Sequence, residues 1–106
     1  MTKIIYIQEI AGTFAENKDI AKKLRIEEVI PTLSKNQDIT FDFENVQGAT
    51  QSFIHALISD PIREFKEIAF DHLLYKNTNE DIQEIISIVY RYLQESLSDE
   101  HHNENE

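Results

Sequence analysis

The pattern of apolar and polar positions along the chain predicts three strands, and in two of them apolar and polar residues alternate with a period of two. The alternation is clearest in residues 39–46, ITFDFENV, where aliphatic or aromatic residues are separated by polar ones. This pattern is typical of a strand with one buried face. Residues 3–10, KIIYIQEI, are mostly apolar and predict a strand that is buried on both faces. Residues 66–73, KEIAFDHL, predict a third strand by a shorter alternation.

A helical spacing of apolar residues follows the first predicted strand. It runs from Asn17 to Leu33, with Asn17 or Asp19 available as the N-cap. Pro31 removes a backbone donor and disfavours helical geometry at the preceding residue. We therefore expect a kinked helix or two short helices in this region.

Two further helices are predicted. One begins near Gln51 and ends at Asp60, just before Pro61. The other opens with Thr78 as N-cap and Asp81 three residues later, which resembles a capping box. Its apolar residues recur at spacings of three and four, typical of an amphipathic helix: Ile82, Ile85, Ile86, Val89 and Leu93.

The order strand, helix, strand, helix, strand, helix predicts the fold class. Such alternation produces parallel strand pairs joined by right-handed crossovers. We expect one small α/β domain over residues 1–95, with a mostly parallel sheet and helices packed on it. Residues 96–106 are polar and acidic without periodicity, so they predict a flexible tail or a frayed end of the last helix.

The charge distribution restricts the kind of partner. The formal net charge is −10, of which residues 77–106 contribute −7, from one Arg and eight Asp or Glu. A chain this acidic is repelled by phosphate backbones, so we expect no direct contact with nucleic acid. No apolar run is long enough to span a membrane, and the first residues lack the pattern of a signal peptide, so we expect a cytoplasmic protein.

Residue sets that carry catalysis are not evident. The chain has no cysteine and only two glycines, and it contains neither a phosphate-binding glycine motif nor a nucleophile elbow. His55 and His72 are interpreted as ordinary surface or partly buried histidines. His101 and His102 lie in the tail, where no fixed geometry for a metal is expected. We therefore expect no enzyme activity, no metal site and no cofactor.

The stretch GATQSFIHALISD, residues 48–60, is the strongest candidate for a functional site. We expect Gly48 to take a positive φ after the strand and Thr50 to cap the helix that begins at Gln51. Ser52 then lies at the second helical position, where backbone N–H groups and the helix dipole favour a negative charge. A phosphate on Ser52 would be stabilised there. The alternative is plain helix capping, without a regulatory role.

The segment FDFENVQGATQSFIHALISD resembles the central motif of the STAS-like domain family of unknown function. The resemblance extends over roughly residues 17–93, and the family is related to anti-sigma-factor antagonists. In those proteins the equivalent turn carries Asp-Ser-Ser-Gly, and its second serine is phosphorylated by a kinase of the GHKL ATPase class. Ser52 matches that serine, whereas Thr50 replaces the Asp and Phe53 replaces the Gly.

This resemblance implies a non-enzymatic regulatory module. The expected docking residues are Gly48, Thr50, Gln51, Ser52 and Phe53, with a GHKL-type ATPase as a candidate partner and Ser52 as a candidate phosphoacceptor. The alternative is a small acidic inhibitor or antitoxin-like protein, which would block a basic nucleic-acid-binding partner through its acidic C-terminal third. Ile88, Tyr92 and Tyr75 are a further candidate contact patch, with a place in the core or incidental exposure as the alternative. No set of residues in the sequence supports an enzymatic function.

Overall fold

The computed structural model describes the backbone of residues 2–104 and the side chains of residues 2–96. A parallel three-stranded sheet has the order β1-β3-β5, and a smaller parallel pair is formed by β2 and β4. The strands are β1 (Thr2–Tyr6), β2 (Phe14–Ala15), β3 (Asp38–Asp42), β4 (Gly48–Ala49) and β5 (Leu73–Lys76). The helices are α1 (Ile7–Ala11), α2 (Lys18–Leu24), η1 (Arg25–Val29), α3 (Ile30–Ser34), α4 (Gln51–Phe65), α5 (Glu67–His72) and α6 (Glu80–Glu104). The predicted α/β class with a mostly parallel sheet is confirmed.

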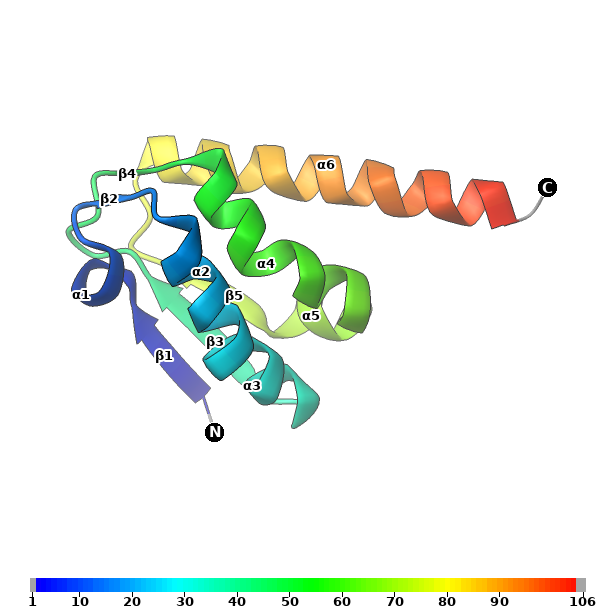
Figure 1. Cartoon of the computed structure of the whole chain (residues 1–106), viewed down its shortest axis with the longest axis horizontal. Helices are drawn as coiled ribbons and strands as arrows, with labels where there is room; N and C mark the ends of the chain where they lie inside the picture. Colours follow the sequence, from blue (N-terminus) through cyan, green and yellow to red (C-terminus); the bar gives the residue numbers. More distant parts are fainter. Residues whose placement is uncertain (1, 105–106) are drawn as a thin grey trace.

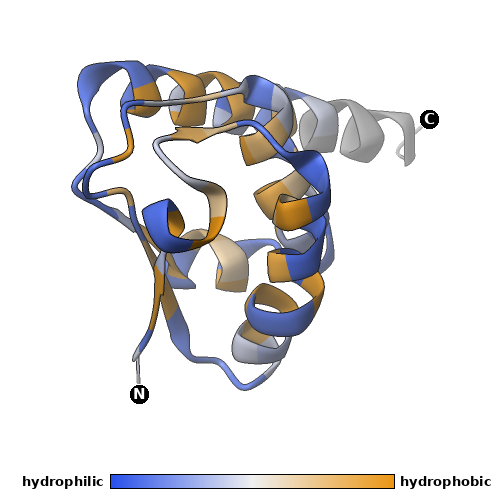
Figure 2. Cartoon of the chain, turned by 60° about the vertical axis from the view of Figure 1, so that its left-hand side comes forward, coloured by the Kyte–Doolittle hydropathy of each residue, from blue (hydrophilic) through white to orange (hydrophobic). Residues whose placement is uncertain are grey.

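The helices lie on one face of the three-stranded sheet. Consecutive parallel strands joined by right-handed crossovers place both connections on the same side. Figure 1 shows α2, α3 and α4 in front of the sheet, with α6 along the far side of α4. In Figure 2 the apolar stretches of the ribbon gather where the helices and the sheet face each other. The core there includes Phe41, Phe43, Leu57, Ile58 and Ile62, all fully buried.

The first strand differs from its prediction. Only Thr2–Tyr6 is extended, and residues 7–11 turn into the short helix α1. β1 lies at the edge of the sheet and is paired with β3 alone, so it is not buried on both faces. Ile5 faces the core, whereas Ile4 is 42% exposed on the face that no helix covers. The apolar run in residues 3–10 therefore predicted the presence of a strand correctly, but not its position at the edge of the sheet.

The predicted first helix is interrupted as expected, by a widened turn. Asn17 is its N-cap, with Oδ1 accepting from the N–H groups of Asp19 (2.9 Å) and Ile20 (3.4 Å). The helix passes from α2 into the π-helical turn η1 before Pro31 enters the first turn of α3. Proline cannot donate to the carbonyl four residues earlier and its ring crowds that group, so a wider preceding turn accommodates it.

Two boundaries in the second half were predicted wrongly. α4 continues through Pro61 to Phe65, because Pro61 is buried within the packed helix and the following residues stay in helical register. Residues 67–72 form helix α5, not a strand. Lys66 takes a positive φ of 53°, accepts from the N–H of Phe70 (3.1 Å) and so starts a new helical turn. The third strand is Leu73–Lys76, selected by its pairing with β3.

Helix α6 is attached to the sheet by two tyrosines. The hydroxyls of Tyr75 on β5 and Tyr90 on α6 are 2.8 Å apart, and the two rings pack edge to face. Burial raises the pKa of Tyr75 well above its ordinary value of 10.0, and the neighbouring Tyr90 adds to the effect. Burial also raises the pKa of Tyr90. Tyr75 is partly buried and packs against Phe41 and Tyr90, whereas Tyr92 is exposed and lies near His55. The two tyrosines therefore do not form the candidate contact patch together.

The tyrosine pair predicts a loss of stability at high pH. Because the folded-state pKa values are raised, the stabilisation is complete below pH ~10, where unfolded tyrosines are neutral, and is lost as pH rises through the folded values. In Tyr75→Phe the alkaline loss should be smaller, and the free energy of unfolding at pH ~7 should fall by about 0.5–1.5 kcal/mol as Tyr90 loses its partner. Denaturant unfolding from neutral to alkaline pH measures both. Exposed Tyr92→Phe is the control, and an unchanged alkaline curve in Tyr75→Phe would contradict the prediction.

Candidate functional site: the corner before helix α4

The candidate site lies where the chain leaves β3 and enters α4. After β3 the segment 43–50 runs beside residues 13–15, with Phe14 paired to Gly48 and Ala15 to Ala49. The N–H of Gln47 donates to the carbonyl of Thr13 (2.8 Å), and the N–H of Thr50 donates to the carbonyl of Ala15 (2.9 Å). These bonds hold the entry to α4 against the N-terminal part of the chain.

Gly48 has a different role from the one predicted. Its φ is not positive, and the left-handed residue after β3 is Asn45, with φ of 65°. The ring of Phe14 lies directly over Gly48, so a Cβ at this position would be only 2.7 Å from the ring atom Cε1. Close packing against Phe14 therefore explains the glycine at position 48. The left-handed residue that was expected there is Asn45 instead.

Thr50 and Ser52 lie where the sequence places them. Thr50 is extended and its Oγ1 accepts from the N–H of Phe53 (3.1 Å), which confirms it as the N-cap of α4. Gln51 and Ser52 occupy the first two helical positions and are exposed. Phe53 is fully buried in the core.

The five predicted docking residues thus divide into two groups. Gln51 and Ser52 offer their side chains to solvent, and Thr50 is half-buried. Phe53 is fully buried in the core, so it positions the corner and presents no surface. Gly48 is buried beneath the ring of Phe14 and lines the groove described below. A docking role for the exposed residues stays a prediction.

The start of α6 is joined to the same corner by Asn79. Its Oδ1 accepts from the N–H of Ile82 (2.9 Å), and its Nδ2 donates to the carbonyl of Gln47 (2.8 Å). Asn79 is therefore the N-cap of α6, and the prediction of Thr78 is wrong. The side-chain amide of Asn79 has an acceptor oxygen and a donor NH₂ group, so it can cap α6 and bond to Gln47 at the same time. The hydroxyl of Thr78 does neither.

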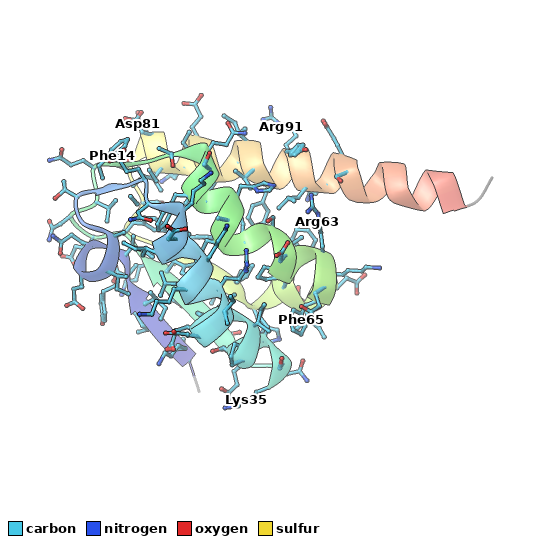
Figure 3. All side chains as sticks on the ribbon, viewed as in Figure 1. Phe14, Lys35, Arg63, Phe65, Asp81 and Arg91 are labelled. Atoms are coloured by element: carbon cyan, nitrogen blue, oxygen red, sulfur yellow. The ribbon has the colours of Figure 1, made fainter. Side chains whose placement is uncertain are left out.

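A groove of about 520 Å³ lies between this corner and α6. It is lined by Phe14, Gln47, Gly48, Ala49, Asp81, Glu84, Ile85 and Ile88. We call it the corner groove. Phe14 is 51% exposed in it, and Figure 3 shows Phe14 and Asp81 at the same end of the molecule. Sequence reasoning missed Phe14, because nothing in the isolated dipeptide Phe14-Ala15 indicates pairing with residues 48–49.

Asp42 fixes the end of β3 beneath the corner. Its Oδ1 accepts from Nδ2 of Asn77 and from the N–H of Glu44, both at 2.9 Å. The Asn77 hydrogen bond, followed by that of the Glu44 backbone, holds the pKa of Asp42 below its ordinary value of 3.8. This carboxylate therefore joins the exit of β3 to the exit of β5, which leads into α6.

The two histidines whose side chains the structure describes, His55 and His72, contact residues of the fold. His72 Nδ1 is 2.6 Å from Oδ1 of Asp38, and the ring of His55 packs near that of Tyr92. Within residues 2–96, no three His, Asp or Glu side chains gather in a way that could hold a metal ion. The side chains of His101 and His102 lie outside the described residues. Among the described helices, none is long and apolar enough to cross a membrane.

Comparison with known proteins identifies the family. Residues 21–83, more than half of the chain, match the model of the STAS-like domain of unknown function. The chain belongs to this STAS-like family. No curated protein and no solved structure matches it. The matched part of the STAS-like domain begins within α2 and ends within α6, so it includes Thr50, Ser52 and the β4 side of the corner groove, whereas β1 precedes it.

Proposed function

We propose that this STAS-like domain is a non-enzymatic regulatory module that docks a partner protein at the corner before α4. The observation that carries the proposal is the position of Ser52. Its hydroxyl is exposed at the second position of a 15-residue helix, next to a half-buried cap and a fully buried phenylalanine. The side chain is accessible to a kinase while the backbone beneath it is held by the core.

The start of α4 favours a phosphate on Ser52. The first N–H groups of a helix have no carbonyl one turn earlier within the helix, and the helix dipole adds a partial positive charge. A phosphate adds a charge of about −1.5 to −2 and three acceptor oxygens at this point. Phosphorylation would therefore change the charge of the docking surface without requiring the core to move. A GHKL-type ATPase is the proposed kinase and partner, as the family's relation to anti-sigma-factor antagonists implies.

The corner groove supplies the rest of the proposed docking surface. Phe14, Ile85 and Ile88 give it an apolar base, and Asp81 and Glu84 are exposed at its side. A partner segment that fits would carry an apolar side chain next to Lys or Arg. Ser52 follows the groove residue Ala49 by three positions, so both belong to one corner of the domain.

The phosphorylation switch is tested by intact-mass measurement. The chain is incubated with the candidate ATPase and ATP, and we expect a gain of one phosphate that is lost in Ser52→Ala. Ser87→Ala, which removes an exposed serine from α6, is the matched control and should still be phosphorylated. Equal phosphorylation of Ser52→Ala and the unmodified chain would reject Ser52 as the acceptor.

Docking is tested separately by binding measurements with the partner recovered from the native host. Phe14→Ala should weaken binding at least about tenfold, since a half-exposed aromatic at an interface core often contributes 2 kcal/mol or more. Ile26→Ala removes an apolar side chain of somewhat greater exposure from η1, away from the corner groove, and should bind normally. Equal affinities for the two variants would contradict docking at the corner.

The acidic-inhibitor alternative rests on the acidic side of the corner groove and on the charge of the C-terminal third. Removal of residues 96–106 distinguishes the two functions. Corner docking should survive the truncation, whereas inhibition of a basic partner should weaken, with a strong dependence on salt concentration.

A further inference from the structure

The outer edge of β1 is open to another strand. Within residues 2–104 the three-stranded sheet ends at β1, which pairs only with β3. An edge strand presents a row of backbone donors and acceptors, and proteins commonly protect it with proline, a bulge or a charge. β1 contains no proline, and its one charge, Lys3, is 3.0 Å from Glu28 and so is drawn toward the helix layer. The edge is therefore not protected by these means.

An apolar groove lies beside this edge, below α2 and η1. It has a volume of about 390 Å³ and is lined by Ile5, Ile10, Ile20, Lys23, Leu24, Glu27 and Glu28. A strand added outside β1 would continue the sheet under the helices, and every second side chain would point toward this groove. Its other side chains would lie beside Ile4 and Tyr6, which are exposed on the uncovered face.

We propose that the strand that pairs here is β1 of a second copy of this chain, antiparallel and related by a two-fold axis. A register centred on Ile4 places Ile4 against its own symmetry mate on the uncovered face, with Thr2 opposite Tyr6. On the helix side it places Lys3 opposite Ile5. Ile4 against Ile4 is an apolar pair, and Thr2 against Tyr6 joins a β-branched and an aromatic side chain, a favourable cross-strand pair. The two-fold axis makes the same patch serve both partners.

The charges beside the groove are self-complementary in this arrangement. α2 and η1 run as one helical segment, with Lys23 in its first half and Glu27 in its second, both exposed at the groove. The two-fold axis makes this segment antiparallel to its mate, so the Lys23 half of each copy faces the Glu27 half of the other. Arg25 points the other way, toward Asp60 on α4 (3.4 Å), so it stays outside the interface.

The overall charge also favours contact at this edge. Residues 1–35 carry six basic and five acidic residues, a net charge of +1, whereas residues 36–106 carry a net charge of −11. Two copies of an acidic chain repel least where the charge is balanced. β1 and α6 lie on opposite sides of the domain, so the acidic helices stay apart (Figure 1).

The test is the molar mass in solution, measured by light scattering and sedimentation over a wide concentration range. We expect about twice the chain mass of 12.4 kDa, with dissociation on dilution. Ile4→Lys places two like charges against each other across the axis and should raise the dissociation constant at least about tenfold. Leu74→Lys is the matched control, since Leu74 lies on the same sheet face at 40% exposure but on the opposite edge strand.

A charge exchange tests the two-fold arrangement at exposed positions. Lys23→Glu alone should weaken the dimer, and Lys23→Glu combined with Glu27→Lys should restore it. A mass of one chain at every concentration overturns the proposal. So does equal dissociation by Ile4→Lys and Leu74→Lys, or a double exchange that fails to restore the dimer. Circular dichroism of each variant confirms that the change in mass is not a loss of fold.

Discussion

Replacing Phe53 with alanine is expected to lower the free energy of unfolding by about 3–5 kcal/mol. The side chain is fully buried at the first turn of α4, within the hydrophobic core. Its removal loses the transfer free energy of an aromatic ring and leaves a cavity that fixed neighbours fill only in part. Domains of this size are stable by roughly 5–15 kcal/mol, so the loss is a large part of the total.

Denaturant unfolding measures this loss when the slope of the free energy against denaturant concentration is the same for both chains. Phe53→Leu is the conservative control, expected to lose much less because it retains most of the volume. Phe14→Ala removes a half-exposed ring and should lose less than Phe53→Ala. A Phe53→Ala loss below ~1 kcal/mol would show that the start of α4 is not anchored through this residue.

The functional consequence follows from the position of Phe53 next to Ser52. At the corresponding place the antagonist motif has glycine, and Phe53 was expected to be one of the docking residues. The ring instead points into the core, so the exposed corner at Gln51 and Ser52 keeps its surface. Phe53→Ala should therefore impair docking by loosening the corner and not by removing a contact.

Much of the fold could be predicted from local patterns. The alternation in residues 39–43 marked β3, and Asn17 marked the start of α2. The third strand could not be placed in this way, because the alternation in residues 66–73 predicts a strand, whereas residues 67–72 form α5. The segment that becomes β5 is chosen by its hydrogen bonds to β3, more than 30 residues earlier, and no local pattern records that pairing.

The candidate site divides in the same way. The cap role of Thr50 and the position of Ser52 in the first turn of α4 were predicted correctly, because capping depends on residues within one turn. The packing of Phe14 on Gly48 and the bond from Asn79 to Gln47 join positions more than 30 residues apart. A sequence pattern contains the first kind of information and not the second, so the groove beside the corner became visible only in the structure.

Asp42→Ala is expected to lower the free energy of unfolding by about 1–3 kcal/mol, because two donors lose their acceptor at a buried strand end. Asp42 is only 5% exposed, and its Oδ1 accepts from Asn77 and from the Glu44 N–H. In the alternating stretch 39–46 Asp42 is a polar position, which predicts a side chain away from the buried face of the strand. The structure shows the strand end, with a carboxylate that joins β3, β5 and the segment leading to Gly48.

The pH dependence of this contribution has a defined sign. The folded-state pKa of Asp42 lies below 3.8, so its stabilisation is present above that pH and is lost as pH falls through the folded value. Asp42→Asn keeps an oxygen that accepts both hydrogen bonds but does not titrate, so it should lose less stability at neutral pH. The difference in free energy of unfolding between the native chain and Asp42→Asn should shrink below pH ~4. Denaturant unfolding of the native chain, Asp42→Asn and Asp42→Ala across this pH range measures the difference, and a difference that grows on acidification would contradict the role of the charge.

If the segment after β3 depends on this carboxylate, Asp42→Ala should also weaken partner docking at the corner while Asp42→Asn retains most of it.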